Sequence, residues 1–341
     1  MAVGAFICGC RGPELTGAEI EFLRSAKPWG FILFKRNCET PEQIRTLTDA
    51  FRAAVGRRDA PVLIDQEGGR VQRLGPPLWR RYPPAAAFGR LHAAEPLRAL
   101  RAAWLVTRLL AEDLRKAGIT VDCLPVLDIP QPGSHDIIGD RAYATDVAVA
   151  SLLARSAMQG LLAGGVLPVI KHIPGHGRAT ADSHLSLPVV GATRSELEQT
   201  DFPPFAALSD APMAMTAHVV YTAIDPDAPA TLSKALIESV IRRDIGFNGL
   251  LMSDDLSMQA LSGSLGERTK GALAAGCDVA LHCNGNLDEM REVAAAAGPL
   301  RGAALARARR ALKALRPPRA FDREFAEAEA ETLCGVAAKV A

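Results

Sequence analysis

Short apolar segments alternate along the chain with longer segments that have the periodicity of helices. The apolar segments are rich in Val, Ile, Leu and Phe and cover residues 4–9, 30–35, 61–66, 119–129, 166–172, 212–219, 249–254 and 277–284. The segments with helical spacing of apolar residues are 41–55, 97–116, 147–162, 194–208, 233–243 and 268–275. Nearly continuous apolar strands that alternate with helices predict an α/β fold with a parallel sheet covered on both faces.

Eight strand–helix repeats predict a closed (β/α)8 barrel of the TIM type, with its active site at the C-terminal ends of the strands. An open doubly wound sheet is the alternative, but no Gly-x-Gly-x-x-Gly follows the first strand. We expect the barrel to occupy residues 1–285, and residues 286–341 to form helices that pack on it within the same domain. Four prolines between positions 76 and 84 predict that residues 73–94 form an irregular loop.

Composition adds limits on partners and location. The 39 basic and 38 acidic residues leave a formal charge of +1, which provides no overall field to attract nucleic acid or anionic lipid. The seven cysteines are odd in number and scattered, which is typical of buried free thiols in a reducing compartment. The apolar residues 2–10 lack a basic leader and a cleavage site, and no apolar run is long enough to span a bilayer. We therefore expect a cytoplasmic protein, monomeric and without cofactor or metal, that binds a small ligand.

Polar and charged residues follow most of the predicted strands. The densest group is the stretch 171–185, which holds Lys171, His172, His176, Asp182 and His184 among glycines that allow the backbone to turn and move. An aspartate two residues from a histidine can orient the imidazole and raise its basicity, so Asp182 and His184 are candidates for acid/base catalysis. The alternative is a surface loop with incidental polar residues.

Carboxylates and arginines supply the other candidates. Asp254 ends the seventh predicted strand, where a carboxylate can act as a nucleophile or stabilise a cation. The neighbouring Asp255 is expected on the opposite side of the strand, as a cap of the next helix. Lys171, Arg141 and the acids and arginines of the segment 65–73 can grip the hydroxyl groups of a polyol. For His282, a core histidine with a satisfied hydrogen bond is the expected role.

Several motifs together resemble glycoside hydrolase family 3, and within it the bacterial β-N-acetylhexosaminidases of peptidoglycan recycling. They are Lys171-His172-Ile173-Pro174-Gly175-His176-Gly177, Asp182-Ser183-His184, Asp65-Gln66-Glu67-Gly68-Gly69-Arg70-Val71-Gln72-Arg73 and Ser253-Asp254-Asp255-Leu256-Ser257-Met258. The resemblance runs from about residue 4 to residue 284, in register with the predicted strands.

The resemblance implies roles for eight residues. Asp254 is expected to be the nucleophile of a retaining mechanism, and His184, paired with Asp182, the general acid and base. Most glycosidases use two carboxylic acids instead. The residues expected to bind the sugar are Asp65, Arg73, Arg141, Lys171 and His172. The implied substrate is N-acetylglucosamine β-linked to 1,6-anhydro-N-acetylmuramic acid, with or without its peptide.

Other activities remain open at this point. A phosphorylase would use phosphate in place of water, and another family 3 β-glycosidase would accept a different sugar. A metal-dependent barrel hydrolase would use His172, His176, His184 and Asp254 as ligands. A sugar-binding barrel without catalysis would need neither Asp254 nor the Asp182-His184 pair.

Overall fold

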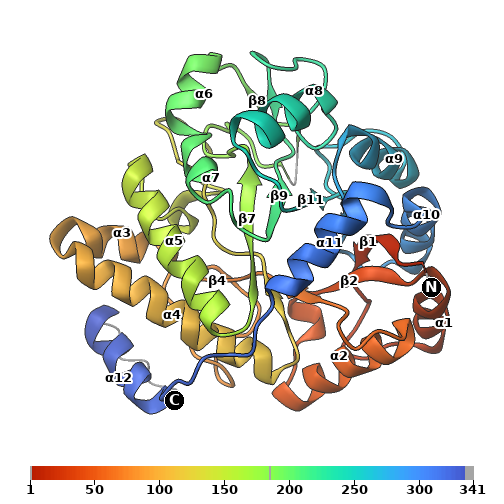
Figure 1. The fold of residues 1–341 in the computed structure, drawn as a ribbon, viewed down its shortest axis with the longest axis horizontal. Coiled ribbons are helices and arrows are strands. Elements are labelled where there is room, and N and C mark those ends of the chain that lie inside the picture. The colour runs from red at the N-terminus through yellow and green to blue at the C-terminus, as the bar shows by residue number, and fades with distance from the viewer. Residues whose placement is uncertain (1, 184–185, 335–341) are drawn as a thin grey trace.

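Eight parallel strands close into a barrel surrounded by helices (Figure 1). The computed structural model describes residues 2–183 and 186–334. Around the barrel the strands follow the order β1-β12-β11-β9-β7-β6-β3-β2. Their bounds are β1 Gly4–Cys8, β2 Pro28–Leu33, β3 Val62–Ile64, β6 Val121–Asp122, β7 Leu167–Ile173, β9 Met213–Thr216, β11 Leu250–Asp255 and β12 Val279–His282. Each predicted strand contributes to the closed sheet, so the predicted barrel is confirmed.

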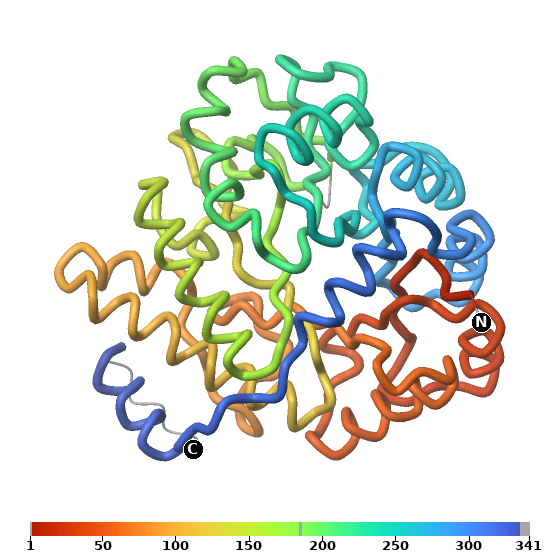
Figure 2. The backbone as a smooth tube through the Cα atoms, in the orientation of Figure 1, coloured from red at the N-terminus to blue at the C-terminus, as the bar shows by residue number. Residues whose placement is uncertain are grey.

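Helices follow the strands along the chain and cover the outside of the barrel. They are α1 Gly17–Ala26, α2 Pro41–Val55, α3 Ala85–Ala94, α4 Pro96–Lys116, α5 Val147–Ala163, α6 Arg194–Thr200, α7 Pro203–Ala207, α8 Lys234–Leu236 with the π-helix Ile237–Asp244, α9 Leu265–Ala275, α10 Leu287–Ala297, α11 Gly302–Ala314 and α12 Arg323–Cys334. Among the described helices, none combines the length and the apolar character needed to cross a membrane. Figure 2 shows the first and the late segments of the chain side by side, because β1 pairs with β12 and closes the barrel.

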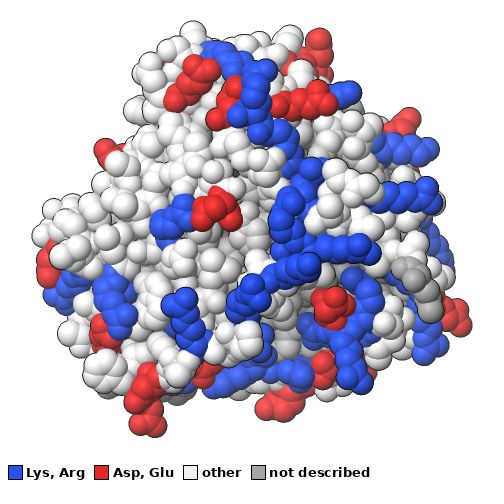
Figure 3. Space-filling view, viewed as in Figure 1, with Lys and Arg blue, Asp and Glu red and all other residues white. Residues whose placement is uncertain are grey.

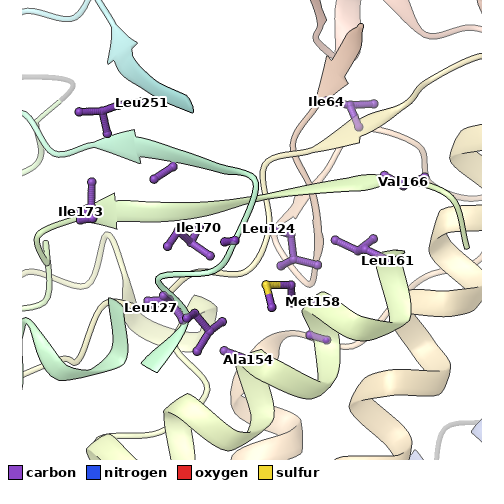
Figure 4. Packing of buried hydrophobic residues seen from close by; sticks show 14 of the residues in the cluster. Ile64, Leu124, Leu127, Ala154, Met158, Leu161, Val166, Ile170, Ile173 and Leu251 are labelled. Carbon is purple, nitrogen blue, oxygen red and sulfur yellow. The ribbon is translucent and has the colours of Figure 1, made fainter. Parts of the chain in front are cut away.

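Side chains of the strands alternate between the barrel interior and the helical layer. On β7, Leu167 and Val169 belong to the interior cluster. Val166 and Ile170 belong instead to the outer cluster, where α5 supplies Met158 (Figure 4). Burial of apolar side chains on both faces explains why the strands read as continuous apolar runs.

Helix α11 closes the N-terminal end of the barrel. Its Ala308 and Ala311 are buried in the interior cluster, and Leu300, which precedes the helix, joins them. In Figure 1 this helix crosses the barrel in the foreground. The opposite end, where the strands terminate, therefore remains open for a site.

The loop expected at residues 73–94 is only partly irregular, because α3 begins at Ala85. Proline is tolerated at the start of a helix, so Pro84 stands just before α3 without interrupting it. The following residues are good helix formers, and the helix buries Ala85 and Phe88. The prolines therefore exclude a helix only up to their own positions.

Other differences also reflect local chemistry that apolar periodicity does not record. The helix predicted at 194–208 is split into α6 and α7, because Pro203 has no N–H for a continuous ladder. Regular pairing of the strand predicted at 119–129 is limited to β6, after which a single bridge joins Val126 to Lys171. Helix α1 was not predicted, although Thr16 and Glu19 form a capping box at its start.

Helix α12 is tied to the rest of the molecule through a buried hydrogen-bonded group. The Tyr82 hydroxyl donates to Asp113 of α4 at 2.6 Å, and Arg323 of α12 lies 2.8 Å from the same carboxylate. Tyr82 also connects to the β4–β5 hairpin (β4 Gln66–Gly68, β5 Val71–Gln72), since its backbone N–H donates to the Gln72 side chain. The C-terminal helix thus supports the hairpin that follows β3.

We expect Tyr82→Phe to lower the free energy of unfolding by about 1–2 kcal/mol, because a buried hydrogen bond to a charged carboxylate is lost. Urea denaturation measures the change. Tyr143→Phe is a matched control, since Tyr143 is also a buried residue, its hydroxyl donates to no described residue, and its ring stacks on Phe88. Equal stability of the two variants would contradict the role of the Tyr82 hydroxyl.

Candidate active site

A cavity of about 400 Å³ lies at the C-terminal end of the barrel. It is lined by side chains from β2, β7, β9, β11 and β12 and from the hairpin after β3. Six of the eight predicted site residues line it: Asp65, Arg73, Arg141, Lys171, His172 and Asp254. The structure therefore brings together residues that are separated by up to 189 positions in the chain.

Strand alternation explains how three of these residues enter the cavity. Leu63, Val169 and Met252 belong to the interior cluster of the barrel. Two positions further along each strand stand Asp65, Lys171 and Asp254, which continue the same inward-facing rows beyond the apolar layers. The barrel interior thus changes from apolar to charged where the strands end.

Lys171 is the centre of a buried network of charges. Its Nζ lies 2.8 Å from an oxygen of Asp65 and 2.8 Å from an oxygen of Glu67. Asp65 also pairs with Arg73 at 3.1 Å, and Glu67 accepts two hydrogen bonds from Arg141 at 2.8 and 2.9 Å. Two carboxylates and three cations thereby form one chain of ion pairs in which each buried carboxylate has two partners.

The network keeps all its members charged. Burial opposes the charge of Lys171, but Asp65 and Glu67 raise its pKa above the usual value. Burial likewise opposes ionisation of Glu67, but Arg141 and Lys171 lower its pKa to about 2. The pKa of Asp65 is also lowered, since Lys171 and Arg73 outweigh its burial. Fixed charges and donors at these positions suit a ligand rich in hydroxyl groups.

Asp128 holds two histidines of the Lys-His motif in place. Its carboxylate lies 2.7 Å from Nδ1 of His172 and accepts backbone N–H groups from His172 at 3.1 Å and His176 at 2.7 Å. Burial would raise the pKa of Asp128, but His172 and His176 lower it to about 2. An ionised Asp128 therefore fixes the orientation of the His172 ring at the cavity wall.

Asp254 stands half-buried at the cavity, with one oxygen accepting the Asp255 N–H at 2.8 Å. Burial opposes its ionisation, but His218, His172 and this backbone N–H lower its pKa below the usual value. The carboxylate is therefore ionised at neutral pH. His218 is fixed by the Thr231 hydroxyl at 2.7 Å and the Asp255 carbonyl at 3.0 Å.

Asp255 does not have the role that was expected for it, which was to cap the next helix. Its carboxylate accepts from the backbone N–H and hydroxyl of Ser257 and from the N–H of Cys283, at 3.0, 2.7 and 3.2 Å. The pairing of β11 with β12 shifts register between Met252 and Asp255. Because of this irregularity Asp255 also lines the cavity, which simple strand alternation did not predict.

The loop after β7 runs along the edge of the cavity. Ser183 is buried there, with its hydroxyl 3.2 Å from Nε2 of His176. Asp182 beside it is half-buried, and His184 lies outside the described residues. Gly177 is required for a close approach, since an added Cβ would lie 2.0 Å from the Ile129 carbonyl oxygen. At this position glycine serves packing, and the predicted backbone mobility does not account for it.

Two predictions concern buried side chains, those of His282 and of the cysteines. His282 is fully buried and its Nε2 lies 2.9 Å from Glu289, which confirms a core histidine, but its Nδ1 has no partner among the described residues, so the ring is satisfied on one side only. Six of the cysteines are buried and Cys334 is half-buried, all as free thiols.

Within residues 2–183 and 186–334, no group of three or more His, Cys, Asp or Glu side chains is arranged to hold a metal ion.

Sequence reasoning assigned no specific role to Glu67 and Asp128. Both were recognised as polar residues after strands, and Glu67 stands within the segment 65–73. In the sequence, Glu67 is 104 positions away from its partner Lys171, and Asp128 is 44 positions away from its partner His172. The available signal was the location of two acids at strand ends that the barrel brings near Lys171 and His172.

Histidine burial predicts a dependence of stability on pH. Burial and the neighbouring His172 lower the pKa of His176 to about 4, whereas a histidine in the unfolded chain has a pKa of about 6.5. The unfolded chain therefore binds a proton first, and stability falls as the pH decreases from about 6.5 to 4, by up to about 3 kcal/mol. Urea denaturation at pH 7.5, 5.5 and 4.5 measures this fall.

The variant His176→Gln provides the control for this pH dependence. It should show a smaller fall over the same range, although its stability at pH 7.5 is also lower because the contact with Ser183 changes. If the stability of the variant fell as steeply with decreasing pH as that of the wild type, His176 would not be the source of the pH dependence. Glu67 and Asp128 lower stability further below about pH 4.5, because their carboxyl groups bind protons near pH 4 in the unfolded chain but only near pH 2 in the folded chain.

A closed (β/α)8 barrel with an ionised carboxylate and a fixed set of cations and acids at its open end is an arrangement that barrel glycoside hydrolases can use. The family model of the glycosyl hydrolase family 3 N terminal domain matches residues 16–313. The chain therefore belongs to glycoside hydrolase family 3, as its motifs indicated.

Individual relatives agree with this assignment. The chain is 40% identical to a beta-hexosaminidase of Methylobacillus flagellatus over 83% of its length and 81% of the relative's. It is also 40% identical to a beta-hexosaminidase of Alkalilimnicola ehrlichii, covering 83% and 82% of the two chains. Among solved structures, NagZ from Neisseria gonorrhoeae in complex with N-trifluoroacetyl-D-glucosamine matches with a TM-score of 0.87 and 32% identity, over 98% of both chains.

Proposed function

We propose that this chain is a retaining exo-β-N-acetylglucosaminidase that removes terminal β-linked N-acetylglucosamine from 1,6-anhydro-N-acetylmuramyl muropeptides during cell-wall recycling. The observation that carries the proposal is the ionised Asp254 carboxylate in the same cavity as the Lys171 network. The relatives named beta-hexosaminidase and the glucosamine derivative bound by NagZ support the choice of sugar.

The cavity has the size and lining expected for one sugar unit. Its volume of about 400 Å³ is at the lower end of the range of small-ligand sites. Arg73, Arg141 and Lys171 supply N–H donors, while Asp65 accepts hydrogen bonds from sugar hydroxyls. Since Asp65 is held by two cations, it keeps its orientation when a hydroxyl group of the substrate approaches. His172 adds an oriented imidazole at the wall.

In the proposed first step, Asp254 attacks the anomeric carbon while the bond between this carbon and the glycosidic oxygen breaks. His184 donates a proton to the departing oxygen, and a covalent glycosyl-aspartate remains. In the second step His184 removes a proton from water, the water oxygen bonds to the anomeric carbon, and Asp254 leaves as a carboxylate. Two inversions retain the β configuration.

The Asp182-His184 pair is proposed as the acid/base group because of its chemistry and because of the location of its neighbour Ser183. Ser183, which stands between the two residues, lines the same cavity as Asp254. A histidine whose orientation is set by an aspartate has a pKa suited to giving and taking a proton near neutral pH. The acid must reach the glycosidic oxygen at the cavity edge, and Ser183 is the described neighbour of the pair at that edge.

Hydrolysis of p-nitrophenyl β-N-acetylglucosaminide, compared with p-nitrophenyl β-glucoside, tests the proposal. We expect kcat/KM for the N-acetylated substrate to be at least 100-fold higher, and proton NMR to detect β-N-acetylglucosamine first. Equal rates for the two glycosides would instead indicate a broader family 3 β-glycosidase. Formation of sugar 1-phosphate in phosphate buffer would identify a phosphorylase, and release of the α-anomer would exclude retention.

A further inference from the structure

The N-terminal end of the barrel, opposite the cavity, is strongly basic. Three hollows of about 740, 670 and 220 Å³ lie there. Each contains residues that directly precede a strand, such as Pro212 before β9, Thr120 before β6 and Val3 before β1. Figure 3 shows the face crossed by α11, where Lys and Arg side chains form a band over the surface.

The hollows concentrate positive charge far beyond the average of the chain. Nine different arginines and three aspartates line them, an excess of six positive charges, whereas the whole chain carries +1. Arg45 and Arg52 pair with Asp49. The other seven arginines form no ion pair with any carboxylate in the described part of the chain. Three of them, Arg57, Arg115 and Arg310, donate to backbone carbonyls, but no described carboxylate neutralises their charges. The net charge of the whole sequence does not show that positive charge is concentrated on this face.

We propose that this basic face docks on an anionic phospholipid bilayer at the level of the headgroups. The cations come from α2 and the turn after it, from the last turn of α4, from α11 and from the segment after it, which spreads them over the end of the barrel. A two-dimensional array of phosphates matches this distribution, and clustered Lys and Arg bind such surfaces. Docking in this orientation leaves the catalytic cavity facing solvent.

The composition of the face favours this partner over single-stranded nucleic acid. Binding of single strands uses aromatic platforms on which bases stack. The aromatic residues lining the three hollows are Trp104 and Trp29, and Trp29 is only 2% exposed. The large exposed hydrophobic residues among those described lie outside these linings, so attachment would be electrostatic, without insertion into the acyl chains.

Vesicle sedimentation with the full chain tests the proposal. We expect binding to vesicles of phosphatidylglycerol and phosphatidylcholine at 50 mM NaCl, loss of binding at 500 mM NaCl, and none to phosphatidylcholine alone. The triple variant Arg58→Gln, Arg309→Gln and Arg316→Gln should bind at least 10-fold more weakly. These three exposed side chains make no hydrogen bond or ion pair with described residues, so aryl glycosidase activity should be unchanged and serves as a check of folding.

The matched control removes three charges elsewhere, with Arg81→Gln, Arg90→Gln and Arg291→Gln, and should bind vesicles like the wild type. The proposal is overturned if neither vesicle binds, if neutral vesicles bind equally, or if the two triple variants bind alike. It is also overturned if duplex DNA displaces the protein from vesicles at equal phosphate concentration, because the face would then prefer nucleic acid.

Discussion

Asp254→Asn is expected to lower kcat for p-nitrophenyl β-N-acetylglucosaminide by about 10⁴-fold or more. Asparagine keeps the shape of the side chain but removes the negative charge that attacks the anomeric carbon. Losses of this size are typical when the nucleophile of a covalent mechanism is removed. Because the Asp254 side chain makes one hydrogen bond within the described part of the chain, with the Asp255 N–H, the variant should remain folded. Steady-state kinetics and urea denaturation measure the two effects.

Asp255→Asn is the control for Asp254, since the two carboxylates are adjacent on β11 and line the same cavity. Asp255 accepts hydrogen bonds from Ser257 and Cys283, so its replacement should reduce stability more than it reduces kcat. If Asp254→Asn kept wild-type turnover while Asp255→Asn lost it, the nucleophile would be Asp255. If both variants kept wild-type turnover, the double-displacement mechanism would fail.

Lys171→Met is expected to lower the free energy of unfolding by about 3 kcal/mol and kcat/KM by at least about 100-fold. The substitution retains the length of the side chain but leaves Asp65 and Glu67 buried without their shared cation. Breaking a buried pair from one side typically costs 3–5 kcal/mol. We expect the lower end of this range because Asp65 keeps Arg73 and Glu67 keeps Arg141. Urea denaturation and kinetics measure the changes.

Two further variants make the Lys171 prediction specific. Lys116→Met removes an ion pair with Glu112 on the surface, where the lysine side chain is 62% exposed, and should change stability by less than about 1 kcal/mol. Adding Glu67→Gln to Lys171→Met removes one of the two carboxylates that shared Lys171 and should restore part of the lost stability. If the double variant were less stable than Lys171→Met, the charge network would not be the cause.

Much of the fold was predictable because strand and helix patterns depend on local spacing. Thr40 and Pro41 mark the start of α2, and the predicted helix 41–55 has the observed bounds. Errors arose where one residue changed the outcome. Pro203 divided a predicted helix, while Pro84 preceded a helix that the density of prolines had hidden. Periodicity records apolar spacing, but it contains little information on how each proline is placed.

The candidate site was predictable in its membership but not in its pairings. Asp65, Lys171 and Asp254 could be assigned to the barrel mouth because each ends an apolar strand. The sharing of Lys171 between Asp65 and Glu67 requires the distance between β3 and β7, which the closed barrel sets. The orientation of His172 by Asp128 has the same origin.

The sequence by itself determined the alternation of strands and helices, the family, and the residues that gather at the ends of the strands. These properties depend on the order and spacing of neighbouring residues along the chain. Only the tertiary structure decided which buried charges pair, and how positive charge is distributed over the surface. Formal charge is a sum over the chain, whereas an electric field depends on where each charge lies. A chain with a charge of +1 can therefore have a candidate active-site cavity at one end of its barrel and a basic face at the other.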